Sequence, residues 1–264
     1  QFFLLMDIHI GSSSYLSKNL RKSVVAINLS SKKKFKYKHK NFNSKVINKL
    51  KFNFIFVFLG KNFKNKNIKK SELINYKLPL KFLNEFLKTK KKIKIVFFGS
   101  FSQYDKEHGL NHKYISQKSR LRKEIIKIKK KNKNFEFVWI YLPNIYGLSQ
   151  NNGFLIPDLL SNMKQNRPIK IKNGLKKIYL LNIEDFVKMI SYIKTNWNKF
   201  KNKSLVSIYE GPYLLSEIIN IINKKYPNQE NIKIKFKSLN EKKINSNIGI
   251  YKKNKFSSFL KNVK

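Results

Sequence analysis

Short, continuous apolar runs alternate with longer amphipathic stretches along the first half of the chain. The runs are rich in β-branched and aromatic residues and end at glycine or polar turns, which is typical of strands. They predict strands at residues 8–10, 24–27, 52–59, 93–98 and 135–142, and a weaker one at 35–39. Because consecutive rather than alternate positions are apolar, both faces of the sheet are expected to be covered.

Helical periodicity fills the intervals between these runs. Helices are predicted at residues 15–22, 71–88 and 114–131, and the core candidates of the second helix are Leu73, Leu80, Leu83 and Phe86. Strands that alternate with helices form a parallel sheet with helices on both faces. The predicted fold class is therefore α/β, a doubly wound Rossmann-like sheet whose ligands bind at the carboxyl ends of its strands.

The pattern changes after Leu142, where a polar loop over 147–153 begins a less regular region. Predicted helices and short strands follow, with helices at 154–165, 184–195 and 214–225 and strands at 169–171 and 232–236. We therefore expect a dinucleotide-binding domain over residues 6–147. A smaller substrate-binding lobe, interleaved with the end of the sheet, is expected over residues 148–264.

The composition is that of a folded protein without thiol or metal chemistry. Of the 264 residues, 41% are hydrophobic and 14% aromatic, which excludes a disordered chain. Cysteine is absent and the four histidines form no ligand-like pair on one helical face, so no metal site is predicted. No apolar run reaches about 18 residues, and the apolar N-terminal stretch lacks the basic segment of a signal peptide. We expect a cytoplasmic protein without a membrane partner.

The formal net charge is +44. A charge of this size is typical of proteins that bind nucleic acids. The lysines, however, are spread over almost every segment, together with asparagine, isoleucine and phenylalanine, which A/T-rich codons encode. A nucleic-acid-binding protein more often concentrates basic residues around aromatic ones on one element. We therefore attribute the charge to genome composition and keep a basic nucleic-acid-binding protein as the less favoured alternative.

A glycine and three serines stand between the first predicted strand and the first predicted helix. The segment 11–17 has the spacing G-x-x-G-x-x-G, but Ser14 and Ser17 stand at the second and third glycine positions. The backbone N–H groups of such a turn, together with a helix N-terminus, hold a pyrophosphate. A serine-rich helix N-cap explains the segment equally well when it is taken alone.

Three further segments carry candidate chemistry. Tyr114 and Lys118 are four residues apart and share a face of the predicted helix. An ammonium beside a phenol lowers the phenol pKa, which would make Tyr114 an acid/base near neutral pH, although a surface pair is the simpler interpretation in so lysine-rich a chain. Ser100, at a strand end, could hydrogen-bond a substrate oxygen. Pro143 and Asn144 follow the next strand, within the segment 141–147.

The order of these four segments resembles the extended short-chain dehydrogenase/reductases of the NAD-dependent epimerase/dehydratase family, which act on nucleotide sugars. In that family a glycine-rich turn follows the first strand and Ser-Ser-x-x-x-Tyr-Gly ends a later one. Tyr-x-x-x-Lys then lies on a helix, and Arg-x-x-Asn-x-Tyr-Gly ends the next strand. The segments similar to these are 11–17, 99–105, 114–118 and 141–147.

The resemblance, which covers about residues 6–225, implies a role for each matching residue. Tyr114 would be the acid/base, Lys118 would bind ribose and tune Tyr114, and Ser100 would hold the reacting oxygen. The other positions that match cofactor-binding residues are Gly11, Ser13, Ser14, Tyr15, Leu16, Asn28, Leu59, Gly60, Asn75 and Pro143. The positions that match substrate-binding residues are Ser102, Asn144, Phe154, Leu155 and, one place from the family's basic residue, Lys177.

Departures from the family pattern bear on the reaction and on the cofactor. Dehydratases of the family carry Asp-Glu just after the catalytic hydroxyl, where Phe101 and Ser102 stand here, and this favours an epimerase or a 4-keto reductase. Residues 28–34 hold serines and lysines but no carboxylate, which favours NADP weakly over NAD. The serines of the turn leave open a catalytically silent dinucleotide-binding protein of the same fold.

The oligomeric state is open as well. The family often forms homodimers through the helix that carries Tyr-x-x-x-Lys. In this chain the predicted helix bears many lysines, which would repel each other across a two-fold axis.

Overall fold

Strands and helices alternate along the first half of the chain. The computed structural model describes residues 6–20, 24–28, 37–38, 42–60, 68–103, 113–171, 173–227 and 232–234. The chain divides into two compact units, of which the first comprises residues 1–142 and 192–206 and the second residues 143–191 and 207–264. The first unit thus consists of a long segment that ends at Leu142 and a short later segment, residues 192–206.

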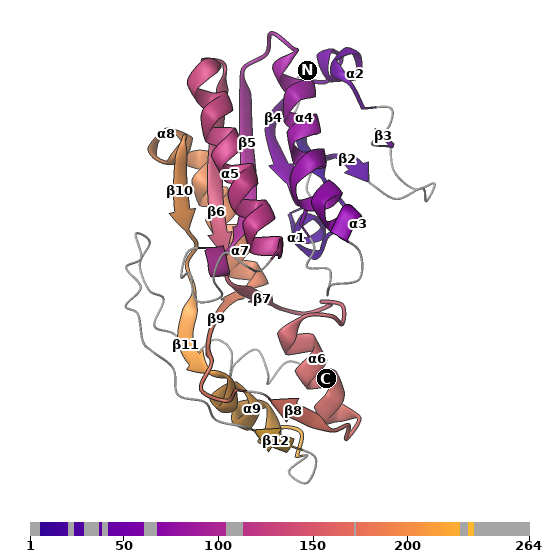
Figure 1. The fold of residues 1–264 in the computed structure, drawn as a ribbon, viewed down its shortest axis with the longest axis vertical. Helices are drawn as coiled ribbons and strands as arrows, with labels where there is room; N and C mark the ends of the chain where they lie inside the picture. Colours follow the sequence, from indigo (N-terminus) through magenta and orange to yellow (C-terminus); the bar gives the residue numbers. More distant parts are fainter. Residues whose placement is uncertain are drawn as a thin grey trace. The chain divides into compact units, whose positions relative to one another are not determined.

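The first unit is built on a seven-stranded parallel sheet. Its strands are, in spatial order, β10 (Lys203–Val206), β6 (Phe135–Leu142), β5 (Ile93–Ser100), β4 (Phe52–Val57), β1 (Met6–Ile10), β2 (Val24–Asn28) and β3 (Tyr37–Lys38). The order reverses between β1 and β4, which are neighbours in the sheet although β2 and β3 come between them in the sequence (Figure 1). Ligands of doubly wound sheets bind beyond the strand ends at such a reversal. The predicted α/β fold class is confirmed.

Helices cover both faces of this sheet. They are α1 (Tyr15–Asn19), α2 (Ser44–Asn48), α3 (Ile68–Glu72), α4 (Leu78–Leu87), α5 (Lys113–Lys131) and α8 (Trp197–Phe200). Figure 1 shows α4 and α5 side by side along one face, where Phe82 and Leu121 belong to one buried core. The opposite face meets α8, whose Trp197 ring packs edge-on against Phe54 with the ring centroids 5.1 Å apart.

A π-helical turn, η2 (Leu73–Lys77), interrupts the second predicted helix just before α4. Pro79 lies in the first turn of α4. In a regular helix its ring would collide with the carbonyl of Asn75, four residues earlier, and the wider π turn relieves that collision. The extra residue rotates the helix face, so Leu73 is exposed while Leu83 is buried. The prediction that Leu73 belongs to the core is wrong.

The second unit contains two small sheets and their helices. β11 (Glu210–Leu214), β9 (Lys177–Asn182) and β7 (Asn144–Tyr146) form one sheet, and β12 (Ile232–Ile234) pairs with β8 (Ile169–Ile171) in the other. Its core combines residues of these strands with α6 (Leu155–Lys164) and α9 (Leu215–Asn223). The helix α7 (Ile183–Thr195) carries the chain back to the first unit. None of the described helices is both long and apolar enough to cross a membrane.

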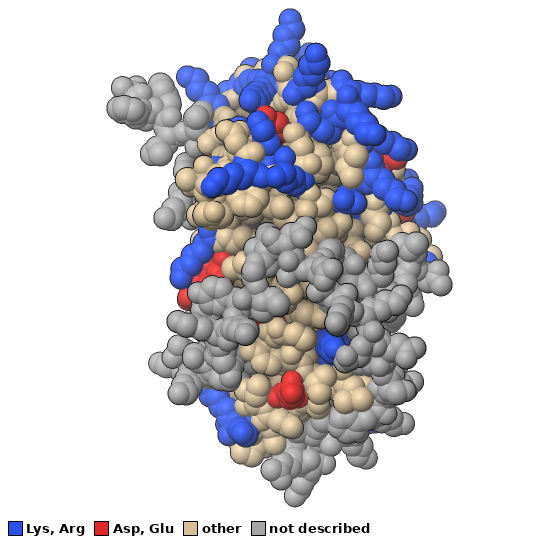
Figure 2. Space-filling model, turned by 90° about the vertical axis from the view of Figure 1, so that its left-hand side faces the viewer, with Lys and Arg blue, Asp and Glu red and all other residues tan. Residues whose placement is uncertain are grey.

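Basic side chains dominate one face of the first unit. Figure 2 shows lysines and arginines gathered over the upper part of the view, with few acidic side chains among them. The last turn of α5 alone carries Lys129, Lys130 and Lys131. Isolated exposed ion pairs, such as Lys127 with Glu124, neutralise only a small part of this charge.

Candidate functional site

The segment after β1 forms a tight turn beside β4. Gly11 has a φ of +84°, a conformation that favours glycine, and the Ser14 amide donates to its carbonyl oxygen at 3.0 Å. A Cβ at Gly11 would lie 3.1 Å from Leu59 Cδ2 and 3.2 Å from the Phe58 carbonyl carbon. The positive φ therefore favours glycine at this position, and an added Cβ would also be tight against the end of β4.

The two serines that replace glycines in this turn have structural partners. Ser14 is the N-cap of α1, and its Oγ accepts from the Ser17 amide at 3.1 Å. Ser17 is fully buried, and its Oγ lies 2.8 Å from Nδ1 of His9 in β1. The hydroxyl thus fills the contact between helix and strand where the family has glycine. Of the remaining predicted residues of the turn, Ser13 is exposed, and Tyr15 and Leu16 are half-buried.

Lys118 lies where the strands β4 and β5 end. Its Nζ donates to the carbonyl oxygens of Leu59 at 2.6 Å and Phe98 at 2.9 Å, and the side chain is almost completely buried. A Cβ at Gly60 would lie 2.9 Å from Lys118 Nζ and 3.5 Å from Tyr114 Oη. The structure thus brings Tyr114, Lys118 and Gly60 together at the carboxyl edge of the sheet, next to the reversal of strand order.

Burial controls the ionisation of both groups in the protein alone. It raises the pKa of Tyr114 to about 12 and lowers the pKa of Lys118 to about 7. Each shift disfavours the charged form of its group. In the protein alone, burial thus raises the pKa of Tyr114, whereas the sequence predicted that Lys118 would lower it.

Ser100 ends β5 and is half-buried. Its amide donates to Gln103 Oε1 at 2.8 Å, and its Oγ accepts from the Ser102 amide at 3.3 Å. Ser102 and Gln103 belong to a short 3-10 turn, η3 (Phe101–Gln103). Gln103 Nε2 in turn donates to Ser119 Oγ on α5 at 3.2 Å. A polar link therefore runs from Ser100 to the helix that carries Tyr114 and Lys118.

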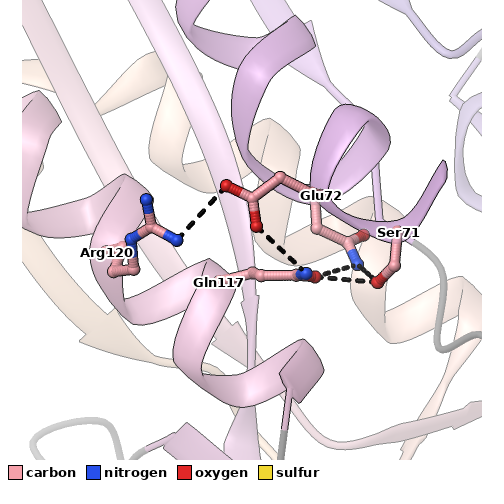
Figure 3. A network of polar contacts seen from close by, with 5 residues as sticks. Ser71, Glu72, Gln117 and Arg120 are labelled. Carbon is pink, nitrogen blue, oxygen red and sulfur yellow. Dashed lines mark hydrogen bonds and ion pairs between the residues drawn. The ribbon is translucent and has the colours of Figure 1, made fainter. Parts of the chain in front are cut away.

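Asn75 belongs to a polar network that joins η2 to α5, of which Figure 3 labels Ser71, Glu72, Gln117 and Arg120. Its Nδ2 donates to Ser71 Oγ at 3.1 Å and to Gln117 Oε1 at 2.9 Å. These contacts hold helices together, so the structure gives this residue a packing role beside the cofactor role implied by resemblance. Gln103 and Gln117 were not predicted, because spacing along the sequence does not reveal contacts between distant elements.

The remaining predicted site residues lie in the second unit or outside the described part. Pro143 follows β6, and Asn144 begins β7, where its Nδ2 donates to the Tyr179 carbonyl at 3.4 Å. Phe154 is exposed as the N-cap residue of α6, Leu155 is the first residue of that helix, and Lys177 begins β9. The side chain of Asn28 and residues 29–34, from which the sequence predicts a weak preference for NADP, lie outside the described residues, as does the segment 104–112.

The second unit also contains a polar pair that the motifs do not include. Tyr146 is fully buried, and its hydroxyl donates to Glu210 Oε1 at 2.6 Å. Burial and this carboxylate raise the pKa of Tyr146 above its usual value. The pair ties β7 to β11 within the three-stranded sheet, and the segment 141–147 therefore has a structural as well as a predicted ligand-binding role.

Comparisons with known proteins agree with this fold. A model of the "NAD dependent epimerase/dehydratase family" matches residues 13–208. A UDP-N-acetylglucosamine 4-epimerase from Methanobrevibacter ruminantium, solved with UDP-N-acetylmuramic acid, has a TM-score of 0.72 at 13% identity over 97% of this chain and 96% of its own. The UDP-glucose 4-epimerase of Thermotoga maritima, solved with UDP-glucose, has a TM-score of 0.71 at 11% identity over 97% of this chain and 93% of its own.

A third similar structure is a dehydratase. The dTDP-glucose 4,6-dehydratase of Bacillus anthracis, solved with NAD, has a TM-score of 0.70 at 14% identity over 89% of this chain and 86% of its own. No curated protein matches the sequence. At such low identities the structural likeness establishes the fold, and the family rests on the matching family model.

Proposed function

The chain belongs to the NAD dependent epimerase/dehydratase family, a family of enzymes, and from this premise we propose that it is an NAD(P)-dependent nucleotide-sugar epimerase or 4-keto reductase. The observation that carries the proposal is the meeting of Tyr114, Lys118 and Gly60 at the ends of β4 and β5. A half-buried phenol beside a buried amine, next to the strand-order reversal, suits proton transfer near a bound dinucleotide.

The turn after β1 fits a dinucleotide. Gly11 has positive φ and lies between the end of β1 and the start of α1, where the backbone N–H groups of such a turn hold a pyrophosphate. Ser13, Ser14, Tyr15 and Leu16 complete the turn, while Leu59 and Gly60 line the neighbouring strand end. Bound NAD or NADP would supply the hydride acceptor or donor, and the residues after β2 favour NADP weakly in this proposal.

The residues of the chain handle the proton and the substrate oxygen. Tyr114 takes the proton of a sugar 4-hydroxyl, or gives one to a 4-ketone, and Ser100 hydrogen-bonds the same oxygen. Lys118 donates to the carbonyl oxygens of Leu59 and Phe98 and so holds the ends of β4 and β5 to α5. In this proposal it also binds the cofactor ribose. Ser102, Asn144, Phe154, Leu155 and Lys177 are the residues proposed to bind the nucleotide sugar.

A ligand screen tests this proposal. We expect NAD or NADP to raise the melting temperature, and one nucleotide sugar from a panel of UDP-, GDP- and dTDP-sugars to raise it further and to be converted. Stabilisation by a dinucleotide without conversion of any sugar would favour the catalytically silent alternative. A protein that neither cofactor stabilises would contradict both.

Replacement of Gly11 tests the proposed phosphate turn. We expect Gly11→Ala to destabilise the protein by about 1–3 kcal/mol and to weaken NAD binding, because alanine is strained at this φ and collides with β4. Gly153→Ala is the matched control, since Gly153 has a φ of +98° but nothing within 4 Å of an added Cβ. Thermal unfolding with and without NAD measures both effects. Equal NAD affinity in the two variants would place the phosphates elsewhere.

The basic surface calls for a separate measurement. If the charge reflects composition, binding to DNA or RNA will be weak and will disappear near physiological salt. Fluorescence anisotropy with labelled single and double strands over a salt series measures this. Tight, sequence-selective binding at physiological salt would instead support the nucleic-acid-binding alternative.

The oligomeric state needs a separate measurement. Size-exclusion chromatography would show whether the protein forms a homodimer.

A further inference from the structure

Three consecutive residues of α5 are attached to three different parts of the first unit. Gln117 joins α5 to α3 and η2, Lys118 joins it to the ends of β4 and β5, and Ser119 joins it to Gln103 of η3. Consecutive helical residues point about 100° apart, so these attachments lie on different sides of the helix. Together they fix both the rotation of α5 and its position along its own axis.

The attachment at Gln117 is a closed polar network (Figure 3). Gln117 Oε1 accepts from Ser71 Oγ at 2.8 Å and from Asn75 Nδ2 at 2.9 Å, and its Nε2 donates to Glu72 at 3.4 Å. Arg120 adds an ion pair with Glu72 at 3.2 Å. Gln117, Ser71 and Asn75 are buried, and buried polar groups that satisfy one another select one arrangement of their helices.

The attachment at Ser119 includes Ser100. Gln103 accepts from the Ser100 amide with Oε1 and donates to Ser119 Oγ with Nε2, so one carboxamide spans the strand end and the helix. Gly99 makes room for it, because a Cβ there would lie 2.5 Å from Gln103 Oε1. Ser100 is thus linked through the Gln103 side chain to Ser119, which directly follows Lys118 on α5.

We propose that Gln103 and Gln117 are positioning residues of the reaction proposed above, which set the Ser100 hydroxyl against Tyr114 and Lys118. The inference rests on the proposed function for its catalytic meaning. Gln103 does not itself touch the substrate. It acts by keeping the strand that carries Ser100 in register with α5, and Gln117 acts by preventing rotation of that helix.

Gln103 is the better residue to test, because it is only half-buried, whereas truncation of Gln117 would leave several buried partners unsatisfied. Gln103→Met keeps the length and removes both hydrogen bonds. Gln103→Glu retains both, since its second oxygen accepts from the Ser119 hydroxyl. Gln165→Met is the matched control at an exposed position that ends α6.

We expect Gln103→Met to lower kcat by about 10- to 100-fold while the KM for the sugar nucleotide and the Kd for NAD change by less than about threefold. Gln103→Glu should recover most of kcat, and Gln165→Met should match the wild-type protein. A kcat for Gln103→Met equal to that of Gln165→Met, or equal losses in Gln103→Met and Gln103→Glu, would overturn the proposal.

Amide hydrogen exchange, measured by NMR on the protein without ligands, supplies a readout that does not depend on turnover. The Ser100 amide should exchange at least about tenfold faster in Gln103→Met than in Gln165→Met, with the amides of β1 unchanged. Unchanged Ser100 exchange would overturn the proposed link. If wild-type protein converts no sugar nucleotide while Ser100 exchange responds as expected, the proposed function fails and the link from Gln103 to α5 stands.

Discussion

Tyr114→Phe is expected to lower kcat by about 100- to 10,000-fold and to leave NAD binding unchanged. The substitution removes one oxygen atom and keeps the ring, so the packing at the start of α5 is preserved. Tyr114 Oη lies at the strand ends beside Gly60 and Lys118, where the proposed proton transfer takes place. Steady-state turnover of the cognate sugar nucleotide and NAD titration by protein fluorescence measure the two effects separately.

The control for this substitution is Tyr192→Phe. Tyr192 lies on α7 and is 55% exposed, with its ring packed edge-on against Phe200. Removal of its hydroxyl tests the loss of a tyrosine oxygen outside the proposed site. If Tyr114→Phe retained as much kcat as Tyr192→Phe, another group would have to be the acid/base, and the proposed role of Tyr114 would be wrong.

Lys118→Met is expected to change how stability depends on pH. Burial lowers the pKa of Lys118 from its ordinary 10.5 to about 7. Between these values the unfolded chain holds a proton that the folded protein lacks, so the stability contributed by this residue rises with pH. The penalty for charging the buried amine is complete below about pH 7 and disappears above about pH 10.5. Relative to Lys118→Met, the wild-type protein should gain about 3 kcal/mol between about pH 7 and pH 9.5.

Urea unfolding of both proteins across this pH range measures the difference. Methionine keeps the length of the side chain and removes the titrating group, so the many other lysines cancel when the two proteins are compared. A difference that stays flat, or that falls with pH, would show that Lys118 remains charged in the folded protein. In that case its two carbonyl partners would outweigh its burial.

The strands β4, β5 and β6 could be predicted because consecutive residues along each of them are buried. A largely apolar run such as 135–142, in which Glu136 is the charged residue, is typical of a strand in a covered parallel sheet, and β6 has the predicted bounds. The strand β10 could not be predicted in this way. It begins with Lys203 and Ser204, lies at the sheet edge, and joins the sheet only because α8 returns the chain to β6. Its place is set by tertiary contacts.

The second unit was harder to predict for the same reason. The strand β9 (Lys177–Asn182) has four consecutive buried residues, yet it lay in no predicted element. Its pairing partners β7 and β11 are short and come from distant segments, so no local pattern indicates the sheet. The π turn η2 is a different case, because Pro79 marks it in the sequence.

In the candidate site, too, some contacts could be predicted from the sequence and others could not. The meeting of Tyr114, Lys118 and Gly60 follows from helical spacing and from the position of strand ends, both of which can be read from the sequence. The contacts of Gln103 and Gln117 join residues up to 46 positions apart and depend on how α5 packs. Gln117 stands inside the Tyr-x-x-x-Lys segment, and a long polar residue there was the available signal.

We propose that the protein moves a hydride at C4 of a nucleotide sugar, with Tyr114 as the proton acceptor. The most direct test supplies UDP-sugars deuterated at C4, with NAD or NADP, and follows the label by NMR and mass spectrometry. We expect the deuterium to pass to the nicotinamide or to return to C4 of the inverted sugar, and not to enter water. The absence of reaction at C4 with either cofactor, or deuterium released into water, would contradict it.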